Sequence, residues 1–482
     1  MTPTKAPEAP ARRARQTATP VVNDDPTDDV DATSTVEFGP WLAQGAELRV
    51  SKWRAGRGFY APAHRGAPTS TRQAEVLNTA AIAAPTDEEG VVIGEDRLSR
   101  TLVAGDPFTA YQKGLISSPN VVVVGDVGAG KSSLTKTVCV LRVLPLRRRR
   151  VVVFDKKDQG GRGEYTSLVE RNGSTPIFFS LDGSEKRSII NLLDPAIVLG
   201  AGLGRTLDLL RAVAETVAGR GLDDWEMEAL RRALRMTMTW GESAGRAPTL
   251  VDLAAQLPRV HTTRDELSPA ARERLHQSAA TVMFVLSGLL EEFSGLFDGE
   301  TSKAIDLSDR LTSFDISQLP ATGPAAPMVV AAANMWLMGV LRRRRGWFTN
   351  VLAEEGWDLI GGANGALWRS LIKLARGLGV SMITNIHKLA DIPKSSPAYA
   401  IIQEAQTVHV FRQSRAEDQA ASIEAFNLES SAGGSLGSLT TGDHLYKVGS
   451  NAEVRVRHVR TPWEIAVTNT DEAMTENGRG QA

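Results

Sequence analysis

Continuous runs of β-branched and aromatic residues alternate with amphipathic segments along much of the chain. The runs "NVVVVGD" at 120–126, "VVVFD" at 151–155 and "PIFFSL" at 176–181 show little polar alternation. Such runs are typical of strands that are buried on both faces of a parallel sheet. A stretch with helical spacing, 131–144, separates the first two runs. The alternation predicts an α/β domain with a mostly parallel sheet.

Residues 203–300 break this rhythm. Three long segments there carry apolar residues at helical spacing, and either Asp223 or Asp224 is suited to cap the second of them. We therefore predict an all-helical insertion within the α/β domain. Strand-like runs resume afterwards at 310–317, 348–354, 379–385 and 407–413, followed by a late pair around "HLYKVG" and "AEVRVRHV".

The flanking sequences differ from this folded part. Residues 1–36 are rich in Pro, Ala, Thr and Asp, and residues 466–482 are similarly polar, so both are predicted to be disordered tails. Short strand-like pieces between Gly/Pro-rich turns predict a small β-containing N-terminal region at 37–113. The α/β core then comprises 114–202 and 301–465.

Composition narrows the class of protein without naming a function. The 482 residues are 42% hydrophobic and 23% charged, with a net charge of -1, so no overall field favours nucleic acid or an anionic membrane. Cys139 is the single cysteine, which excludes a disulfide framework and a cysteine-rich metal site. No apolar run approaches the ~20 residues that span a bilayer. We expect a cytoplasmic protein that partners recruit to the inner face of the cell membrane.

The segment "GDVGAGKSS" at 125–133 fits the phosphate-loop pattern G-x-x-x-x-G-K-[ST]. It follows an apolar strand and opens a helix, so its backbone N–H groups can form an anion-binding nest. Lys131 is expected to reach the β- and γ-phosphates of ATP, and the Ser132 hydroxyl is expected to bind Mg²⁺. The predicted nucleotide-binding residues are Gly125, Gly128, Ala129, Gly130, Lys131, Ser132 and Ser133.

Two adjacent glutamates, Glu354 and Glu355, end a later strand-like run in "VLAEE". A nucleotide-hydrolysing site needs one carboxylate for the water shell of the magnesium ion and another to orient the attacking water. A solvated acidic turn is the alternative explanation. The phosphate loop upstream favours the ATP site.

Several motifs, taken in order, resemble the FtsK–HerA-type P-loop ATPases, and most closely the motor ATPases of conjugation and type IV secretion systems. The resemblance covers roughly 90–460 and implies a RecA-like core, ATP hydrolysis and a hexameric ring. The motifs that carry it are "GDVGAGKSSL", "VFDKKDQGGRGEYTSLVE", "INLLDP", "TSFDISQLP", "VLAEEGWDL" and "ARGLGVSMITNIHKLADI".

The resemblance implies separate roles for the two glutamates. The family's second motif commonly reads Asp-Glu-Ala-Trp, where this chain has "EEGW" at 354–357. Glu354 would then hold the magnesium's water shell and Glu355 would activate the nucleophile. Glu354 departs from the family pattern, because its side chain is one methylene longer than aspartate.

The resemblance also implies a polar sensor and an arginine that acts on a neighbouring subunit. The sensor is usually glutamine, and the matching position here is Asn385 in "MITNIH". A simple turn residue after its strand is the alternative explanation for Asn385. Arg376 in "KLARGLGV" matches the place of the arginine, while Arg369 and Arg412 are competitors.

Other charged residues have simpler explanations. Two arginine runs, 147–150 and 342–345, each end a predicted helix just before a strand. Complementing the helix macrodipole is the favoured explanation, and a DNA-facing or subunit-facing surface is the alternative. Asp155 matches the family's "FD-x-K" pattern, either closing a turn or supporting the site. His387 and His409 lack metal-ligand spacing and are expected on the surface or in the core.

Three functions remain in competition. The first is an ATP-hydrolysing motor of conjugative DNA transfer or type IV secretion, with membrane-anchored components of that machinery as partners. The second is a coupling-protein-like DNA translocase, for which DNA is the partner. The third is a nucleotide-gated assembly subunit with little turnover.

Overall fold

The computed structural model describes residues 89–183, 187–262, 267–320, 322–354, 376–390, 392–396 and 399–468. All of them belong to Glu75–Ala482, one of the two compact units of the chain. Glu355 and Arg369 lie outside the described residues, and so do the predicted tail 1–36 and residues 469–482. The predictions made for these residues stay predictions.

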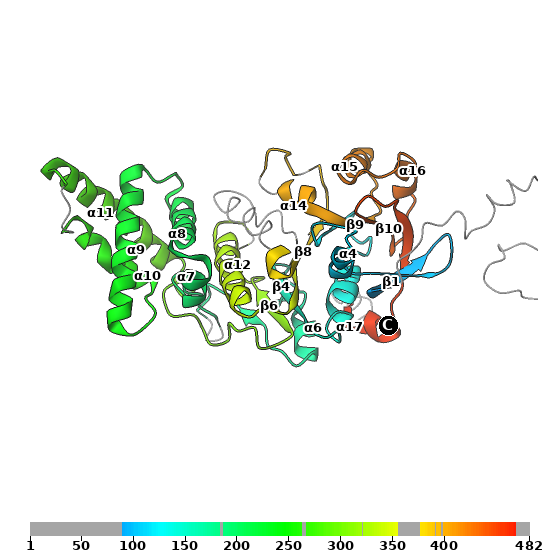
Figure 1. Ribbon diagram of the computed structural model, residues 1–482, viewed down its shortest axis with the longest axis horizontal. Helices are drawn as coiled ribbons and strands as arrows, with labels where there is room; N and C mark the ends of the chain where they lie inside the picture. The colour runs from blue at the N-terminus through cyan, green and yellow to red at the C-terminus, as the bar shows by residue number, and fades with distance from the viewer. Residues whose placement is uncertain are drawn as a thin grey trace, which may run out of the picture. The chain divides into compact units, whose positions relative to one another are not determined.

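The described strands form one eleven-stranded sheet in the order β2-β1-β11-β10-β9-β3-β8-β7-β4-β6-β5 (Figure 1). The strands from β9 to β5 are parallel to one another, and those from β2 to β10 pair in antiparallel fashion. The strands are β1 (Val91–Asp96), β2 (Leu102–Gly105), β3 (Asn120–Val124), β4 (Arg149–Asp155), β5 (Ile177–Phe178), β6 (Leu311–Asp315), β7 (Phe348–Glu354), β8 (Val380–Ile386), β9 (Ala405–Phe411), β10 (Asp443–Val448) and β11 (Val454–His458).

The central strands are buried on both faces, as their unbroken apolar runs predict. In β3, Val122 and Val124 belong to one hydrophobic cluster, whereas Val121 and Val123 belong to the cluster on the other side. All four are at most 2% exposed. The sequence-based expectation of an α/β core with a mostly parallel sheet is therefore confirmed.

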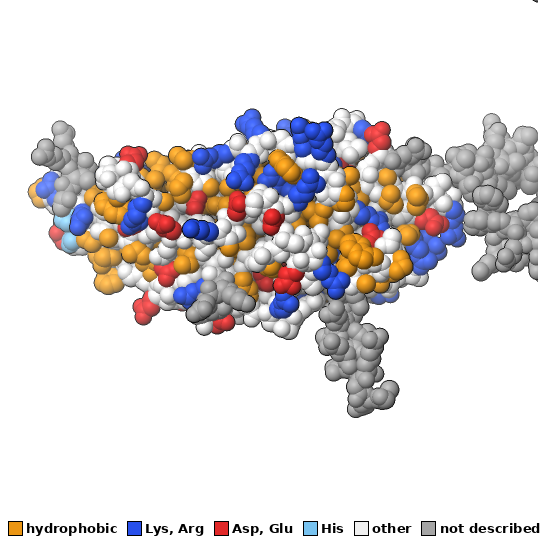
Figure 2. Space-filling model, turned by 90° about the horizontal axis from the view of Figure 1, so that it is seen from below, with side chains coloured by type: hydrophobic (Ala, Val, Ile, Leu, Met, Phe, Trp, Pro, Cys, Tyr) orange, Lys and Arg blue, Asp and Glu red, His pale blue; other side chains and the backbone are white. Residues whose placement is uncertain are grey.

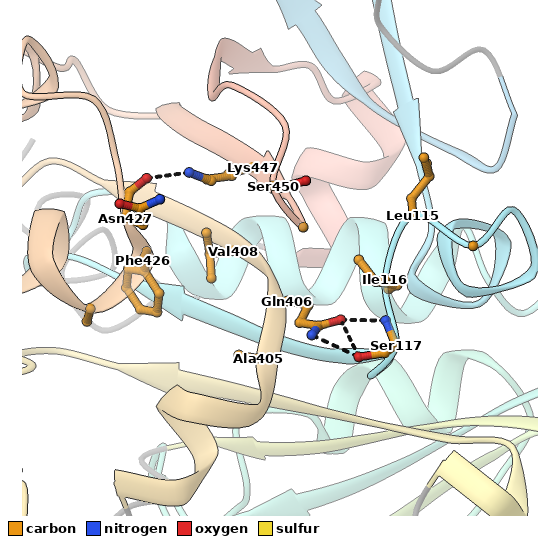
Figure 3. Close-up of a pocket in the computed structure, with 13 residues that line it drawn as sticks. Leu115, Ile116, Ser117, Ala405, Gln406, Val408, Phe426, Asn427, Lys447 and Ser450 are labelled. Atoms are coloured by element: carbon orange, nitrogen blue, oxygen red, sulfur yellow. Dashed lines mark hydrogen bonds between the residues drawn. The ribbon is translucent and has the colours of Figure 1, made fainter.

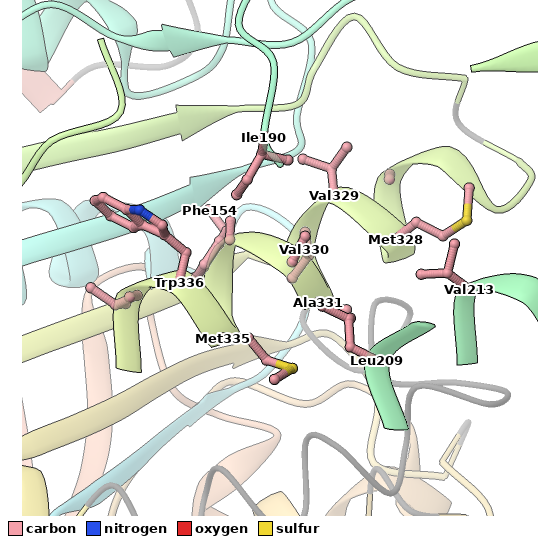
Figure 4. Close-up of a cluster of buried hydrophobic side chains, with 14 of the residues drawn as sticks. Phe154, Ile190, Leu209, Val213, Met328, Val329, Val330, Ala331, Met335 and Trp336 are labelled. Carbon is pink, nitrogen blue, oxygen red and sulfur yellow. The ribbon is translucent and has the colours of Figure 1, made fainter. Parts of the chain in front are cut away.

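Helix α12 (Ala325–Arg343) is the main apolar helix against one sheet face. Its side chains, including Met328, Val329 and Trp336, meet residues of the sheet and of α8 (Figure 4). By length and composition α12 could cross a membrane, which corrects the expectation that no apolar run of that length exists, but most of it is buried inside the protein. It is a core helix.

Helix α12 packs closely on α7 (Pro195–Ala201). A Cβ atom added at Gly339 would lie 1.9 Å from the Ala196 carbonyl oxygen, and one at Gly200 would lie 2.3 Å from the Gly339 Cα atom. The two helices therefore touch through backbone, which only glycine permits at these positions.

The predicted helical insertion is present. It contains α8 (Leu203–Ala218), α9 (Asp224–Ala244), α10 (Leu250–Gln256) and α11 (Pro269–Glu292), shown in green in Figure 1. Of the two candidates for capping α9, Asp223 is the N-cap: its carboxylate accepts from the Glu226 backbone N–H, and the Glu226 carboxylate accepts from the Asp223 N–H. This capping box fixes the start of the helix.

The described part of the N-terminal region extends the main sheet. Strand β1 pairs with β11, and β2 pairs with β1. Arg142 connects this edge to α17 (Pro462–Thr468), because its guanidinium donates to the Glu464 carboxylate at 2.7 and 2.9 Å and to the Val92 carbonyl at 2.6 Å. These bonds hold the pKa of Glu464 at about 2.

Candidate functional site

The strand order brings the phosphate loop, Asn385 and Glu354 to one edge of the sheet. Strand β8 lies between β3 and β7, with Val123 of β3 opposite Asn385 and with Asn385 opposite Glu354 of β7. All three strands are parallel, so the phosphate loop, Asn385 and Glu354 follow one another along the carboxyl edge. Ligands of open parallel sheets bind at this edge.

The phosphate loop after β3 depends on glycine. Gly125, Gly128 and Gly130 have φ values of 147°, 75° and 111°, which disfavour other residues. A Cβ atom at Gly125 would also lie 2.6 Å from the Phe411 Cβ atom. Asp126 fastens the loop to the segment after β9, since its carboxylate accepts from the Ser414 N–H at 2.8 Å.

A helix begins directly after the loop, as expected. Its first turn, α5 (Lys131–Leu134), contains the half-buried Ser132 and Ser133, and the buried Ala129 lies in the loop before it. The helix then continues as a π-helix, η1 (Thr135–Leu141), where a plain helix was expected. Single π-helical turns often occur beside functional sites.

Lys131 extends back across the phosphate loop. Its ammonium donates to the carbonyls of Gly125 at 2.6 Å and Asp126 at 2.8 Å, and it lies 3.0 Å from the His387 Nδ1 atom. The side chain is 5% exposed. The lysine is thus held across the phosphate loop, with His387 beside it. Sequence reasoning did not predict this position for His387.

A chain of hydrogen bonds crosses the site from the phosphate-loop helix to the end of β7. Thr135 donates to the Asn385 Oδ1 atom at 3.0 Å, and the Asn385 amide donates to both Glu354 carboxylate oxygens at 2.7 and 2.8 Å. The Tyr165 hydroxyl donates to the Glu354 Oε1 atom at 2.5 Å. Asn385 and Tyr165 therefore fix the carboxylate of the longer glutamate from two sides.

Two aspartates anchor the segment that presents Tyr165. Asp155, at the end of β4, accepts from the Tyr165 N–H at 2.6 Å, and Asp315, at the end of β6, accepts from the Gly163 N–H at 3.0 Å. A Cβ atom at Gly163 would lie 2.3 Å from the Asp155 Oδ2 atom, so this position also needs glycine. The family-like "FD-x-K" aspartate thus supports the site by holding its loop.

Lys136 and Glu164 form a buried ion pair next to this loop. Their charged atoms are 3.1 Å apart, and both side chains are at most 3% exposed. The Lys136 ammonium also lies 5.1 Å from the centre of the Tyr165 ring. No sequence pattern predicted this ion pair. The only indication was that Glu164 lies in the "GRGEY" stretch of a family-like motif.

Burial and like charges perturb the titration of this cluster. Burial raises the pKa of Glu354, and the negative charge of Glu164 adds to the increase, while the hydrogen bonds from Tyr165 and Asn385 oppose it. Burial likewise raises the pKa of Asp155 to about 8, despite the Tyr165 N–H bond. Burial lowers the pKa of Lys136, which the Glu164 charge counteracts.

The raised pKa of Asp155 predicts a pH-dependent stability. An unfolded aspartate has a pKa of about 3.9, so the native state binds the proton more tightly than the unfolded state does. Protonation of Asp155 therefore stabilises the fold at low pH, and this stabilisation is lost as pH rises from about 4 through 8. The difference in unfolding midpoint between wild type and Asp155→Asn should therefore depend on pH. It should favour wild type more at pH 5 than at pH 8.5. An equal difference at both values would contradict the assignment.

Removing the Tyr165 hydroxyl should loosen Glu354. We expect Tyr165→Phe to weaken Mg²⁺-dependent ATP binding about tenfold, the scale of one hydrogen bond to a charged group. The loss should grow as the pH is lowered, because the Tyr165 hydrogen bond opposes the rise in the pKa of Glu354. Nucleotide titrations with Mg²⁺ and with EDTA measure this directly. Tyr111→Phe, at a 40% exposed tyrosine, is the matched control. It should change neither the affinity for ATP with Mg²⁺ nor its dependence on pH.

The residues fit a magnesium ion that arrives with a nucleotide. Among the described residues, no group of three or more His, Cys, Asp or Glu side chains could hold a metal alone. Mg²⁺ usually keeps several waters and binds through one or two carboxylates plus substrate phosphates. Ser132 in the first helical turn and Glu354 at the end of β7, on the same edge of the sheet, are suited to such partial coordination.

Two of the three candidate arginines, Arg376 and Arg412, lie at opposite edges of the sheet. Arg376, exposed in a 3₁₀ turn before β8, donates to the Ser117 carbonyl at 3.4 Å. The whole of β8, about 20 Å long, separates it from Asn385, so Arg376 could act only on a neighbour's nucleotide. Arg412 lies beside its own phosphate loop, because its carbonyl accepts from the Asp126 N–H at 2.8 Å.

A separate pocket of about 600 Å³ opens at the amino edge of the parallel strands (Figure 3). Gln406 lies in it with Ser117, whose N–H donates to the Gln406 side-chain oxygen at 2.5 Å. Lys447 and Asn427 line another part of it. This pocket contains none of the predicted nucleotide-binding residues.

Comparison with known proteins addresses the fold. No protein-family model and no curated protein matches the chain. The solved structure of VirB4 of Thermoanaerobacter pseudethanolicus matches with a TM-score of 0.62 and 20% identity, covering 80% of this chain and 100% of that chain. The bacterial conjugative coupling protein TrwB, in an unbound form, matches with a TM-score of 0.48 and 16% identity, covering 83% and 95%.

The VirB4 match confirms the predicted fold. The chain has a RecA-like P-loop core with a mostly parallel sheet and a helical insertion, and its resemblance to the FtsK–HerA-type ATPases holds at the level of the fold.

Proposed function

We propose that this protein is the ATP-hydrolysing motor of a conjugative DNA transfer or type IV secretion system. The observation that carries the proposal is the meeting of the phosphate loop, Asn385 and Glu354 on three adjacent strands. The VirB4-like fold and the ordered family motifs support the type of machinery.

In the proposed mechanism, the chain's own residues position ATP and its attacking water. Lys131 exchanges its bonds to the loop carbonyls for bonds to the β- and γ-phosphates, where its charge offsets the charge that develops during transfer. Ser132 and Glu354 would hold Mg²⁺ together with its water shell, and the ion would supply positive charge to the phosphates. Glu355 accepts the proton of the attacking water, and Arg376 is the candidate that completes a neighbouring site.

The proposed surroundings follow from this role. A hexameric ring would let Arg376 act on the next subunit. The protein would work in the cytoplasm, with membrane-anchored secretion or conjugation components recruiting it to the membrane. A coupling-protein-like translocase shares the same fold and would bind DNA itself.

One observation favours a nucleotide-gated subunit with little turnover as the second candidate. Both Glu354 oxygens accept hydrogen bonds from Asn385, and one also accepts from Tyr165. Burial also raises the pKa of this carboxyl, which weakens it as a partner for the magnesium shell. A subunit of this kind would bind ATP and assemble without sustained hydrolysis.

Particle mass and phosphate release, measured on the same samples, separate these functions. The motor predicts hexamers with a non-hydrolysable ATP analogue and steady phosphate release without DNA. Strong stimulation by DNA that falls steeply with salt would favour the translocase. Assembly with ATP but no phosphate release above the Glu355→Gln level would instead favour the gated subunit.

A further inference from the structure

The two arginine runs, far apart in the sequence, meet at the amino edge of the sheet. Strand β4 begins within the first run and pairs with β7, which begins just after the second, so that Arg149 lies opposite Phe348. The Phe348 N–H donates to the Arg148 carbonyl at 2.9 Å. Arg310, just before the neighbouring β6, accepts through its carbonyl from the Val151 N–H at 2.7 Å. Three adjacent strands thus start in one basic surface.

We call this surface the arginine edge. Its exposed members are Arg147, Arg148, Arg310, Arg343, Arg344 and Arg345. Two acidic residues, Asp306 and Asp309, precede β6, and Asp306 lies 3.6 Å from Arg344. The arginines outnumber these acids on a chain whose net charge is -1. Helix C-terminal charge explains one run at a time, but it does not explain why the two runs converge.

Only part of this positive charge is compensated: Arg149 pairs with Asp106, whereas Arg150 has no acidic partner among the described residues. The residue is 4% exposed, and its Nε and Nη1 atoms form no hydrogen bond with described residues. Its guanidinium stacks on Trp347 at 4.6 Å, and Arg310 approaches the same ring at 5.8 Å. A buried guanidinium beside other arginines favours an anionic ligand that would offset its charge.

Exposed apolar residues lie beside the arginines at the same edge, so the ligand should have an apolar part as well as negative charge. The turn before the first run holds the exposed Pro145 and Leu146, the latter 36% exposed. Arg310 braces this turn by donating to the Leu144 carbonyl at 2.8 Å. Figure 2 shows Lys and Arg side chains over the middle of the molecule with apolar side chains among them.

A membrane surface can bind both the arginines and the apolar residues of the arginine edge. Anionic headgroups attract arginine, and leucine and tryptophan side chains favour the headgroup boundary. The phosphates of nucleic acid would bind the arginines, but an exposed leucine gains no favourable contact with a phosphate backbone. Single-stranded nucleic acid would also need an aromatic face free for stacking, whereas the Trp347 ring already contacts two guanidiniums. We propose that the arginine edge binds the surface of an anionic phospholipid membrane directly, independently of the proposed ATPase function.

Vesicle binding by the full chain tests this proposal. Wild type should sediment with phosphatidylcholine vesicles that contain 30 mol% phosphatidylglycerol, the composition chosen as the probe, and not with pure phosphatidylcholine. The triple variant R147A/R148A/R345A should bind about a hundredfold more weakly, since each arginine near such a surface contributes ~1 kcal/mol. Leu146→Ser should weaken vesicle binding but leave heparin binding unchanged.

Matched controls make the result decisive. R205A/R235A/R272A removes the same charge from the helical insertion and should bind vesicles like wild type. Unfolding midpoints show whether each variant is folded, and replacing the same three edge arginines with lysine should retain binding. Equal vesicle binding by both triple variants would overturn the proposal. So would an edge-dependent loss of duplex DNA binding without any vesicle binding, or no binding to either probe.

Discussion

Glu355→Gln should leave the protein loaded with ATP that it does not hydrolyse. Glu355 directly follows β7, whose last residue, Glu354, ends at the carboxyl edge beside Asn385. An amide cannot accept the proton of the attacking water, and loss of a general base typically costs 10²–10⁴ in rate. We expect hydrolysis to fall about a thousandfold while ATP binding is kept.

The nucleotide retained after gel filtration tests this expectation. Wild type incubated with Mg²⁺ and ATP should carry mainly ADP, and Glu355→Gln should carry ATP. Glu242→Gln, at an exposed position on α9, should behave like wild type. If Glu355→Gln instead retains ADP, the catalytic role belongs to another residue.

Lys131→Ala should weaken ATP binding about 10- to 100-fold. The ammonium lies across the phosphate loop, within hydrogen-bonding distance of the Gly125 and Asp126 carbonyls, where it can reach a bound phosphate. Hydrogen bonds to charged groups contribute about 1.5–3 kcal/mol each, which is the scale of this loss. A fluorescent ATP analogue titrated against the protein measures the affinity.

Lys303→Ala, at an exposed lysine, is the matched control for charge. The unfolding midpoint shows whether the Lys131 variant is folded. A folded Lys131→Ala variant with wild-type affinity would mean that the nucleotide binds elsewhere.

Local patterns predicted much of the fold. The buried valine runs gave strands such as β3 and β4 because a strand covered on both faces needs apolar side chains at every position. The phosphate loop was predictable because all its determinants lie within nine consecutive residues, including the glycines that adopt positive φ. The sequence left two aspartates, Asp223 and Asp224, as candidates for the N-cap of α9. Only the hydrogen bonds of Asp223 in the structure decide between them.

The rest depends on contacts between distant segments. Tyr165 meets Glu354 across 189 residues, and Thr135 meets Asn385 across 250. No periodicity in a single sequence encodes such pairs. The convergence of the arginine runs likewise follows from the pairing of β4 with β7. The length of α12 was missed because Asn334 and Gly339 interrupt its apolar residues, although both are accommodated inside the core.

The central claim is that the phosphate loop and the end of β7 form one ATP-hydrolysing site. Phosphate release by purified wild type, measured with Mg²⁺ and with EDTA alongside Lys131→Ala and Glu355→Gln, tests it most directly. We predict steady, Mg²⁺-dependent release by wild type that is lost in both variants. Release by wild type no faster than by Glu355→Gln, in samples shown to bind ATP, would contradict the claim.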